Sequence, residues 1–272
     1  MSIKLLTLNV SIFDENNEKL TRFLKEVTPD IICLQEVTRK VDNFALGAYI
    51  SKGAIDQATP ELIHSFYAPN WALKDFKQNN FHGKSVFQHD FGGIIEYGNY
   101  IKSRFTITDG KSIFVQDHFS YITDWDWISN HHGEEPRMVQ IADLMIDEVQ
   151  ELRILNYHGI WSKNKQDTDR TLSAIQKLVQ FAHEVNYPVI ICGDFNLFPD
   201  TRSIKVLKDN FTSLVDEFNI MSTRPKSNEL SGVNRNVVDY VFISKNISVK
   251  AFKVIDSDVS DHLPLFLDFT IV

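Results

Sequence analysis

Short apolar runs of strand character recur along the whole sequence, with a few helical patterns between them. Ile3–Val10 alternates like a strand, Glu18–Val27 carries apolar residues at helical spacing, and Ile31–Leu34 is a short buried strand. The chain therefore opens as β-α-β. Further strands are predicted at Tyr97–Phe105, Ser112–Val115, Arg137–Ile146, Leu152–Gly159, Val189–Cys192, Val237–Ile243, Val249–Ile255 and Leu265–Ile271. Further helices are predicted at Asp167–Val185, capped by Asp167 or Thr168, and at Thr201–Lys208.

The dominance of strands favours two sheets that pack face to face, with the helices outside. The chain has 272 residues, of which 43% are hydrophobic, so it can bury a sizeable core. No repeat, low-complexity tract or linker interrupts the pattern. We therefore predict an α/β fold built as a single domain over residues 1–272.

Two segments of the sequence are harder to interpret. Residues 50–90 hold many aromatic residues but show weak periodicity. Gln116–Glu135 contains four aromatic residues and five acids without any Lys or Arg, and we predict a long surface loop there. His131 and His132 lie in this segment and are expected to be solvated.

The charge and the cysteine content limit the environment and the partners of the chain. The formal net charge is -8, so a polyanionic substrate would have to be attracted locally, by a metal ion and a few basic side chains. The two cysteines, Cys33 and Cys192, lie in strand-like runs and are predicted to be buried thiols. No signal peptide and no apolar run long enough to cross a bilayer are visible. We therefore expect a cytoplasmic protein without a membrane segment, and the sequence indicates no protein partner.

Polar residues stand at the ends of four predicted strands, where the strand itself does not require them. Each has a plain alternative explanation, since Gly-Asp-x-Asn is a good turn sequence and a Glu after a strand can cap a helix. Four independent turns have no reason to supply such a set of ligands together. Oxygen ligands of this kind suit a hard cation such as Mg²⁺. The residues are Asn9, Glu36, Asp194 with Asn196, and Asp261 with His262.

These segments resemble the ordered motifs of the endonuclease/exonuclease/phosphatase superfamily, the deoxyribonuclease-I-like proteins. The resemblance covers residue 3 to about residue 270. It implies a four-layer α/β sandwich of two mixed or antiparallel sheets, and cleavage of a phosphoester with Mg²⁺ or Mn²⁺. The matching segments are Leu8–Val10, Asp30–Val37, Gly98-Asn99 with Ser103-Arg104, Asn156–His158, Gly193–Asn196, Val238–Tyr240 and Ser260–Pro264.

The resemblance implies a catalytic role for five residues. Asp194 resembles the residue that positions or deprotonates the attacking water, and Asn196 the residue that orients the phosphate or the nucleophile. His262 resembles the histidine at the scissile phosphate, acting as a base or as a charge stabiliser, and Asp239 the carboxylate that orients it. His158 resembles a second histidine, a phosphate contact or general acid; as a plain alternative, it is an ordinary histidine at a strand end.

The metal ion and the substrate involve further residues. The resemblance implies that Glu36 is the main metal-binding carboxylate, with Asn9 beside it and Asp261 in the inner or outer shell of the metal. Asn99 and Arg224 are predicted to contact the substrate. Arg224 is the arginine that we would test first, although most arginines of this kind form surface ion pairs.

The sequence also departs from one branch of the superfamily. In the exonuclease III branch an acid usually lies two residues after the first Asn, and here that position is Ser11. A histidine such as His158 instead resembles the deoxyribonuclease-I-like, sphingomyelinase-like and phosphatase branches. An acidic partner for it is expected before the Gly98-Asn99 strand, and Glu96 is the candidate.

Three functions remain open on the sequence alone. The first is a metal-dependent phosphodiesterase that acts on nucleic acid or another phosphodiester. The second is a phosphomonoesterase or a lipid-headgroup hydrolase of the sphingomyelinase or inositol-phosphatase kind, because the aromatic, acidic loop at 116–135 would repel a DNA backbone. The third is a catalytically dead binding protein, which the complete ligand set disfavours.

Overall fold

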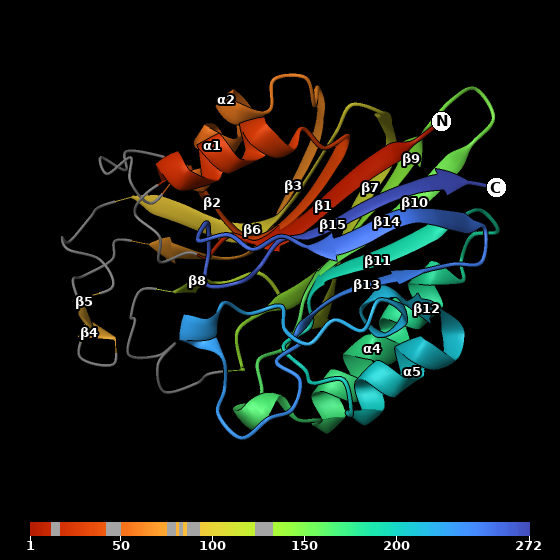
Figure 1. The fold of residues 1–272 in the computed structure, drawn as a ribbon. Helices are drawn as coiled ribbons and strands as arrows, with labels where there is room; N and C mark the ends of the chain where they lie inside the picture. Colours follow the sequence, from red (N-terminus) through yellow and green to blue (C-terminus); the bar gives the residue numbers. More distant parts are fainter. Residues whose placement is uncertain (12–16, 42–49, 75–79, 82–83, 86–92, 123–132) are drawn as a thin grey trace.

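Two β-sheets pack against each other, with helices on both outer faces of the pair (Figure 1). This computed structural model describes the chain except for residues 12–16, 42–49, 75–79, 82–83, 86–92 and 123–132. Within the described residues one sheet has seven strands in the order β14-β15-β1-β2-β6-β3-β8, and the other has six in the order β12-β13-β11-β10-β9-β7. Both sheets contain parallel and antiparallel pairs. The predicted four-layer α/β sandwich is therefore confirmed.

The strands and helices have the following bounds. The larger sheet consists of β14 (Ile247–Val254), β15 (Leu265–Ile271), β1 (Ile3–Asn9), β2 (Ile31–Lys40), β6 (Ile94–Ser103), β3 (His64–Lys74) and β8 (Tyr121–Ile122). The smaller sheet consists of β12 (Thr212–Ser213), β13 (Asp239–Ile243), β11 (Val189–Asp194), β10 (Glu151–His158), β9 (Arg137–Met145) and β7 (Thr106–Gln116). The helices are α1 (Asn17–Val27), α2 (Ser51–Ala58), α4 (Asp169–Ala182), α5 (Arg202–Asn210) and α6 (Leu214–Glu217). β4 (Asn80–Phe81) pairs antiparallel with β5 (Lys84–Ser85).

The first strand is central to the larger sheet. β1 pairs in parallel with β2 and antiparallel with β15, so the first and last strands of the chain lie side by side (Figure 1). Alternation sends Leu6 and Leu8 to the outer face, where α1 packs Leu20 and Leu24 against them. The inner faces of the two sheets share a second apolar core. The parallel β1–β2 pair therefore ends at one defined edge, next to the smaller sheet.

A parallel pair is also central to the smaller sheet. β10 and β11 run in parallel, and α4 connects them across the outer face. Thr168 caps α4 by accepting a hydrogen bond from the backbone N–H of Thr171. Asp167, the other predicted cap, instead accepts hydrogen bonds from the backbone N–H groups of Arg202 and Ser203 at the start of α5. The turn before α4 is thereby tied to the segment that follows β11.

The two segments that were hard to interpret contain regular structure. α2 and β3 lie within residues 50–90, where the sequence showed weak periodicity. The predicted surface loop at 116–135 is corrected in part: Tyr121–Ile122 forms β8 beside β3, and Glu135 is buried with Arg137. His131 and His132 lie outside the described residues. Across the described part of the chain, no helix has both the length and the apolar character needed to span a bilayer.

Candidate active site

Two parallel strand pairings, one in each sheet, end at the same place. In the larger sheet Asn9 at the end of β1 lies opposite Gln35 of β2, next to Glu36. In the smaller sheet His158 at the end of β10 lies opposite Asp194 at the end of β11. Because the carboxyl ends of parallel strands lie at one edge, these side chains converge where the two sheets meet.

A β-bulge directs Glu36 into this edge. Between Leu34 and Val37 the register of β2 against β6 shifts by one residue, and Glu36 adopts a left-handed backbone with φ of 61°. Such a conformation costs of order 1 kcal/mol or more for a residue with a Cβ atom, and it clusters at functional sites. The bulge turns a residue of a buried strand toward the site.

Glycine allows the strands to approach closely under Asp194. Gly193 has φ of +133°, and a Cβ there would lie 2.1 Å from the carbonyl oxygen of Tyr157 on β10. A Cβ on Gly159 would lie 2.2 Å from the carbonyl oxygen of Phe195. Only glycine fits at these two positions, and its lack of a side chain lets the backbones at the ends of β10 and β11 approach this closely.

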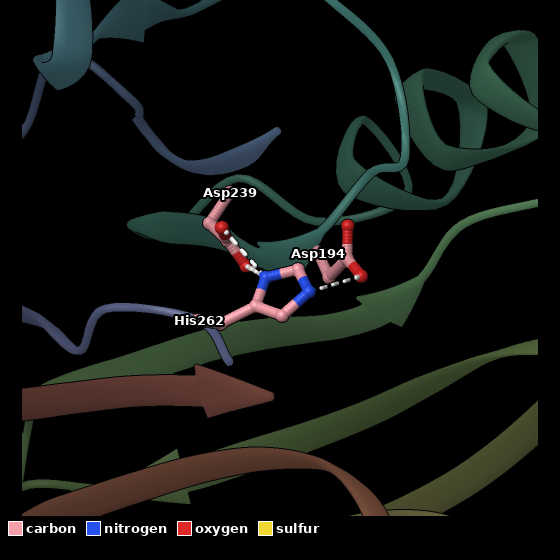
Figure 2. Close-up of side chains that lie close together, drawn as sticks. All are labelled: Asp194, Asp239 and His262. Carbon is pink, nitrogen blue, oxygen red and sulfur yellow. Dashed lines mark hydrogen bonds and ion pairs between the residues drawn. The ribbon is translucent and has the colours of Figure 1, made fainter. Parts of the chain in front are cut away.

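Asp194 is the centre of the cluster and is almost fully buried. Its Oδ2 accepts a hydrogen bond of 3.1 Å from Asn9 Nδ2, which also donates to Glu36 Oε1 at 3.0 Å. His158 Nε2 lies 3.6 Å from Asp194 Oδ2 and 3.7 Å from Glu36 Oε1. His262 Nε2 lies 3.7 Å from Asp194 Oδ2 (Figure 2). Asn9, Glu36, His158, Asp194 and His262, each predicted as a site residue, therefore lie together.

His262 is held from behind by Asp239. Its Nδ1 lies 3.0 Å from both carboxylate oxygens of Asp239, and Figure 2 shows the ring between that carboxylate and Asp194. Thr223 donates a hydrogen bond of 2.7 Å to Asp239 Oδ2 and so fixes the carboxylate in turn. The structure thus brings Asp239 to the place expected of a residue that orients His262.

The charges of the cluster follow from burial and from the neighbouring groups. Burial opposes the charged form of His262, but the carboxylates of Asp239 and Asp194 outweigh it and raise the pKa of His262 to about 10. Burial also opposes the charge of Asp194, yet the positive charge of His262 dominates and lowers the pKa of Asp194 to about 2. At neutral pH the pair is therefore an imidazolium beside a carboxylate.

His158 has the opposite character. Burial lowers its pKa to about 3, with a further contribution from the positive charge of Arg137, so the ring is neutral at neutral pH. Its Nε2 faces two carboxylates, which only accept hydrogen bonds, so we assign the proton to Nε2. Its Nδ1 then accepts from the Tyr97 hydroxyl at 3.2 Å. His158 therefore presents an N–H group to the site.

The predicted partner of His158 needs correction. Glu96 pairs with Arg39, and the residue that reaches His158 is its neighbour Tyr97, stacked on Trp71 with 4.4 Å between ring centroids. Neighbouring residues of a strand point to opposite faces, so Tyr97 faces the inter-sheet layer and Glu96 the outer face of the sheet. A phenol takes the place that we expected for a carboxylate.

The predicted substrate contact of Asn99 also needs correction. Asn99 has no exposed surface, and its Nδ2 donates to the backbone carbonyl of Asn156 between the two sheets. Asn156 in turn bonds to Gln35 and Gln140. This buried polar network joins β2 at Gln35 to β10 at Asn156, so Asn99 contacts protein rather than solvent.

Asp261 and Arg224 lie at the rim of the cluster. The Ser260 hydroxyl donates a hydrogen bond of 2.7 Å to the backbone carbonyl of Asn9, and its Oγ lies 3.3 Å from Asp261 Oδ1. Ser260 therefore links Asp261 to the end of β1. Asp261 is exposed and accepts from Asn228. Arg224 donates from Nε to the backbone carbonyl of Asn228 at 2.7 Å. The predicted roles of Asp261 in metal binding and of Arg224 in substrate binding stay predictions.

Two buried cations lie beside the site: Lys165, which was not recognised in the sequence, and Arg137, one of several arginines that the sequence offered as a phosphate contact. Lys165 donates from Nζ to Asn196 Oδ1, and Asn196 donates from its backbone N–H to Asp194 Oδ1 at 2.8 Å. Arg137 donates from Nε to the backbone carbonyl of Gly159 at 3.0 Å. Lys165 lies in a polar segment whose composition is typical of a solvated loop. Arg137 is a charged residue at the start of a buried strand, and that position was a weak indication that it contributes to the site.

The cluster contains donor atoms that fit a divalent cation. Asp194, Asp239 and His262 offer ligand atoms within 4.8 Å of one another. However, Asp239 occupies Nδ1 of His262 and the ring is protonated, so this histidine is a poor ligand. Glu36 and Asp194 turn their oxygens toward the same nitrogen of Asn9, and such an oxygen-rich set suits a hard cation. The residues present therefore fit a divalent metal better at Glu36 than at His262.

The pKa of His262 leads to a prediction for stability in metal-free protein. The folded pKa lies near 10 against an ordinary value of 6.5, so the stabilisation is complete below pH 6.5 and is lost as pH rises toward 10. Lys165 acts in the opposite sense above pH 8, because burial lowers its pKa to about 8. We therefore expect the free energy of unfolding to fall by up to ~1.4 kcal/mol per pH unit between pH 6.5 and 8.

Urea denaturation in EDTA at several pH values measures this slope. The His262→Gln variant should show a much smaller decline in the same window, because it has no imidazolium to lose. His183→Gln is the matched control, since His183 lies on the protein surface, where it contacts Asn210. Equal slopes in the wild type and in His262→Gln would contradict the assignment of the charge to His262.

The fold and the site together define a class of protein: α/β sandwiches with a cluster of carboxylates and histidines at one edge of the two sheets. The chain belongs to the Endonuclease/Exonuclease/phosphatase family, whose model matches residues 6–262. The predicted resemblance is therefore confirmed, and membership supports phosphoester hydrolysis as the class of reaction.

Comparisons with individual proteins agree with this assignment. Over 137 residues the chain is 24% identical to a UPF0294 protein of Vibrio campbellii, a match that covers 50% of this chain and 46% of that protein. An endonuclease/exonuclease/phosphatase from Beutenbergia cavernae has a similar structure (TM-score 0.69, 13% identity, 99% of this chain and 72% of that chain).

Two further proteins of similar structure have a more specific activity or ligand in their names. One is TDP2 of D. rerio complexed with a single-strand DNA product (TM-score 0.63, 15% identity, 99% of each chain). The other is the mannosyl-6-phosphatase Bt3783 of Bacteroides thetaiotaomicron (TM-score 0.61, 15% identity, 99% of this chain and 100% of that chain). At such identities the likeness concerns the fold.

Proposed function

We propose that this protein is a divalent-metal-dependent phosphoester hydrolase, most favourably a phosphodiesterase or nuclease, in which water attacks phosphorus. The observation that carries the proposal is the shared carboxylate of Asp194. It is contacted by Asn9 and lies within 3.7 Å of both His158 and His262. An anionic group that orients water, beside two N–H donors for a phosphate, is what this reaction requires.

The sequence left open whether Asp194 positions the attacking water or deprotonates it. The low pKa of Asp194, about 2, supports the positioning role. A carboxylate of such low basicity is a weak general base, but it accepts a hydrogen bond from a water molecule and orients it. His262 carries a proton on Nε2 and suits the role of charge stabiliser for a phosphate oxygen. His158 is neutral and donates from Nε2, which suits a phosphate contact.

A metal ion would add the charge that these side chains lack. Glu36, with Asn9 and Asp194 beside it, would hold the ion, and Mg²⁺ or Mn²⁺ would neutralise charge on the phosphate group. The protein part of the reaction is then to orient water at Asp194 and to donate hydrogen bonds from the two histidines.

The proposed unit is the single domain of residues 1–272, because β15 completes the sheet that β1 begins. A cytoplasmic location stays a prediction.

Turnover of a generic phosphodiester tests the proposed function. We expect bis(p-nitrophenyl) phosphate to be hydrolysed with Mg²⁺ or Mn²⁺ and not in EDTA. A second panel of single-stranded DNA, a phosphomonoester, sphingomyelin and an inositol phosphate then ranks the substrates. Absence of metal-dependent turnover across the whole panel would contradict the proposed function.

A second candidate is a phosphomonoesterase or a lipid-headgroup hydrolase, and one feature beside the site favours it. A cleft of about 630 Å³ lies at Asp261, and Asp256 and Asp258 line it as well. These acids would repel the backbone of a nucleic acid but not a small phosphoester that does not extend across them. Preference for DNA over the small substrates would remove this candidate.

A further inference from the structure

Lys165 places a buried ammonium group in the wall of the site. The residue is only 8% exposed, although the segment around it is polar and solvated. Its Nζ donates a hydrogen bond to Asn196 Oδ1 and lies 5.5 Å from the centre of the Trp161 ring. Burying a lysine costs free energy unless a partner compensates, so this placement requires an explanation.

The backbone around Lys165 is built to hold it there. Asn164 and Lys165 both adopt left-handed conformations, with φ of 57° and 56°. This conformation is unfavourable for a residue with a Cβ atom, so the surroundings must enforce the turn. The Lys165 carbonyl accepts a hydrogen bond of 3.0 Å from the backbone N–H of Phe198, and the Lys165 N–H donates to the Ser162 carbonyl at 3.1 Å. The turn is thereby fixed to the segment that carries Asn196.

The contacts of Asn196 determine which way its side-chain amide points. An ammonium group only donates hydrogen bonds, so the atom that faces Lys165 must be the carbonyl oxygen, Oδ1. A backbone carbonyl only accepts, so the atom that faces Gly159 at 3.3 Å must be Nδ2. The NH₂ group has two hydrogens, and the Gly159 carbonyl takes one of them. One N–H group of Asn196 is left to donate.

We propose that Lys165 is a positioning residue, which fixes the amide of Asn196 so that an N–H group and not the carbonyl oxygen faces an anionic phosphate oxygen. The reversed amide would turn its oxygen toward the phosphate and repel it. The inference rests on the proposed function, since it assigns Asn196 to the phosphate of an anionic phosphoester. It adds Lys165, which acts together with the Gly159 carbonyl, as a residue that fixes the orientation of Asn196.

A double-mutant cycle tests whether Lys165 acts through Asn196. We expect Asn196→Ala to lower kcat/KM by ~10²-fold and Lys165→Met by ~10-fold or more. The combined variant should be within about threefold of Asn196→Ala alone, since the orientation no longer matters once the amide is gone. Lys165→Arg keeps a donor toward Oδ1 and should restore part of the activity. Lys163→Met is the matched control, because Lys163 lies in the same turn and is exposed.

Binding of inorganic phosphate to metal-free protein gives a second reading that does not depend on turnover. Calorimetry should show weaker binding in Lys165→Met and in Asn196→Ala, with no further loss in the combined variant. If the losses of phosphate affinity in the two single variants multiply in the combined variant, Lys165 acts independently of Asn196 and the proposal is overturned. Wild-type phosphate affinity in Lys165→Met would also overturn it. If the wild type hydrolyses nothing but the phosphate cycle is non-additive, the proposed function fails while the positioning role stands. Thermal denaturation of every variant checks that the fold is intact.

Discussion

Asp194→Ala is expected to abolish phosphoester hydrolysis, lowering kcat/KM by at least ~10³-fold. The contacts of the site converge on Asp194 Oδ2, which lies 3.1 Å from Asn9 Nδ2, 3.6 Å from His158 Nε2 and 3.7 Å from His262 Nε2. Asp194→Ala removes the carboxylate that lies close to both histidines and that we assign to the orientation of water. Steady-state kinetics on a phosphodiester with Mg²⁺ measures the loss.

Two further variants separate the charge of Asp194 from its shape. Asp194→Asn keeps the volume but removes the negative charge, so we expect it to be about as inactive as Asp194→Ala. Asp209→Ala is the control, since Asp209 lies on the surface of α5 in an exposed pair with Lys205. It should retain wild-type kinetics. Turnover close to the wild type in Asp194→Ala would contradict the proposed mechanism, provided that its melting temperature shows a folded protein.

The location of the site could be predicted because it depends on strand ends. Asn9, His158 and Asp194 end three strands, and the parallel pairs β1–β2 and β10–β11 bring such ends to a common edge. The same reasoning predicted the sandwich itself, since alternating and continuous apolar runs are visible in the sequence. His262 was found through the motif around it, as a residue of the connection that leads into β15.

The direction of side chains within a buried strand could not be predicted. In β6 nearly all residues are buried, and both faces carry apolar as well as polar residues, so the pattern does not reveal which face is which. Glu96 and Tyr97 differ by one position, and a carboxylate was the expected partner of His158. Since the alternation places Tyr97 inside, the phenol rather than the acid reaches the histidine. Asn99, two residues further on, faces the same inner layer and is buried for the same reason.

The contribution of irregular segments was equally hidden. Lys165 becomes a buried residue only because two consecutive left-handed residues turn the chain, and the sequence around it has the composition of an exposed loop. The bulge that directs Glu36 into the site leaves no mark in the sequence of β2 either. α2 is eight residues long and contains a glycine, so its helical periodicity is too short to be recognised. These features depend on contacts with distant segments.

Glu36→Gln is expected to remove most of the stabilisation that a divalent metal gives to the folded protein. The amide keeps an acceptor for Asn9 Nδ2, which now donates to Glu36 Oε1 at 3.0 Å, so the fold should be retained. The lost charge is the one that we assign to the metal. For the wild type, Mn²⁺ at a hundred times its Kd should stabilise the fold by ~2.7 kcal/mol, because only folded protein binds it at this site.

Denaturation with and without Mn²⁺ measures this stabilisation directly, without relying on turnover. In EDTA, Glu36→Gln should be at least as stable as the wild type, because it removes a negative charge that faces Asp194 across the Asn9 amide. With Mn²⁺ only the wild type and the control Glu61→Gln, an exposed position, should gain stability. A gain in Glu36→Gln equal to that of the wild type would move the metal away from Glu36 and toward the Asp194–Asp239 side of the cluster. Loss of stability in EDTA would instead show that Glu36 supports the fold, and that its bulged, left-handed position is maintained for packing rather than for a cation.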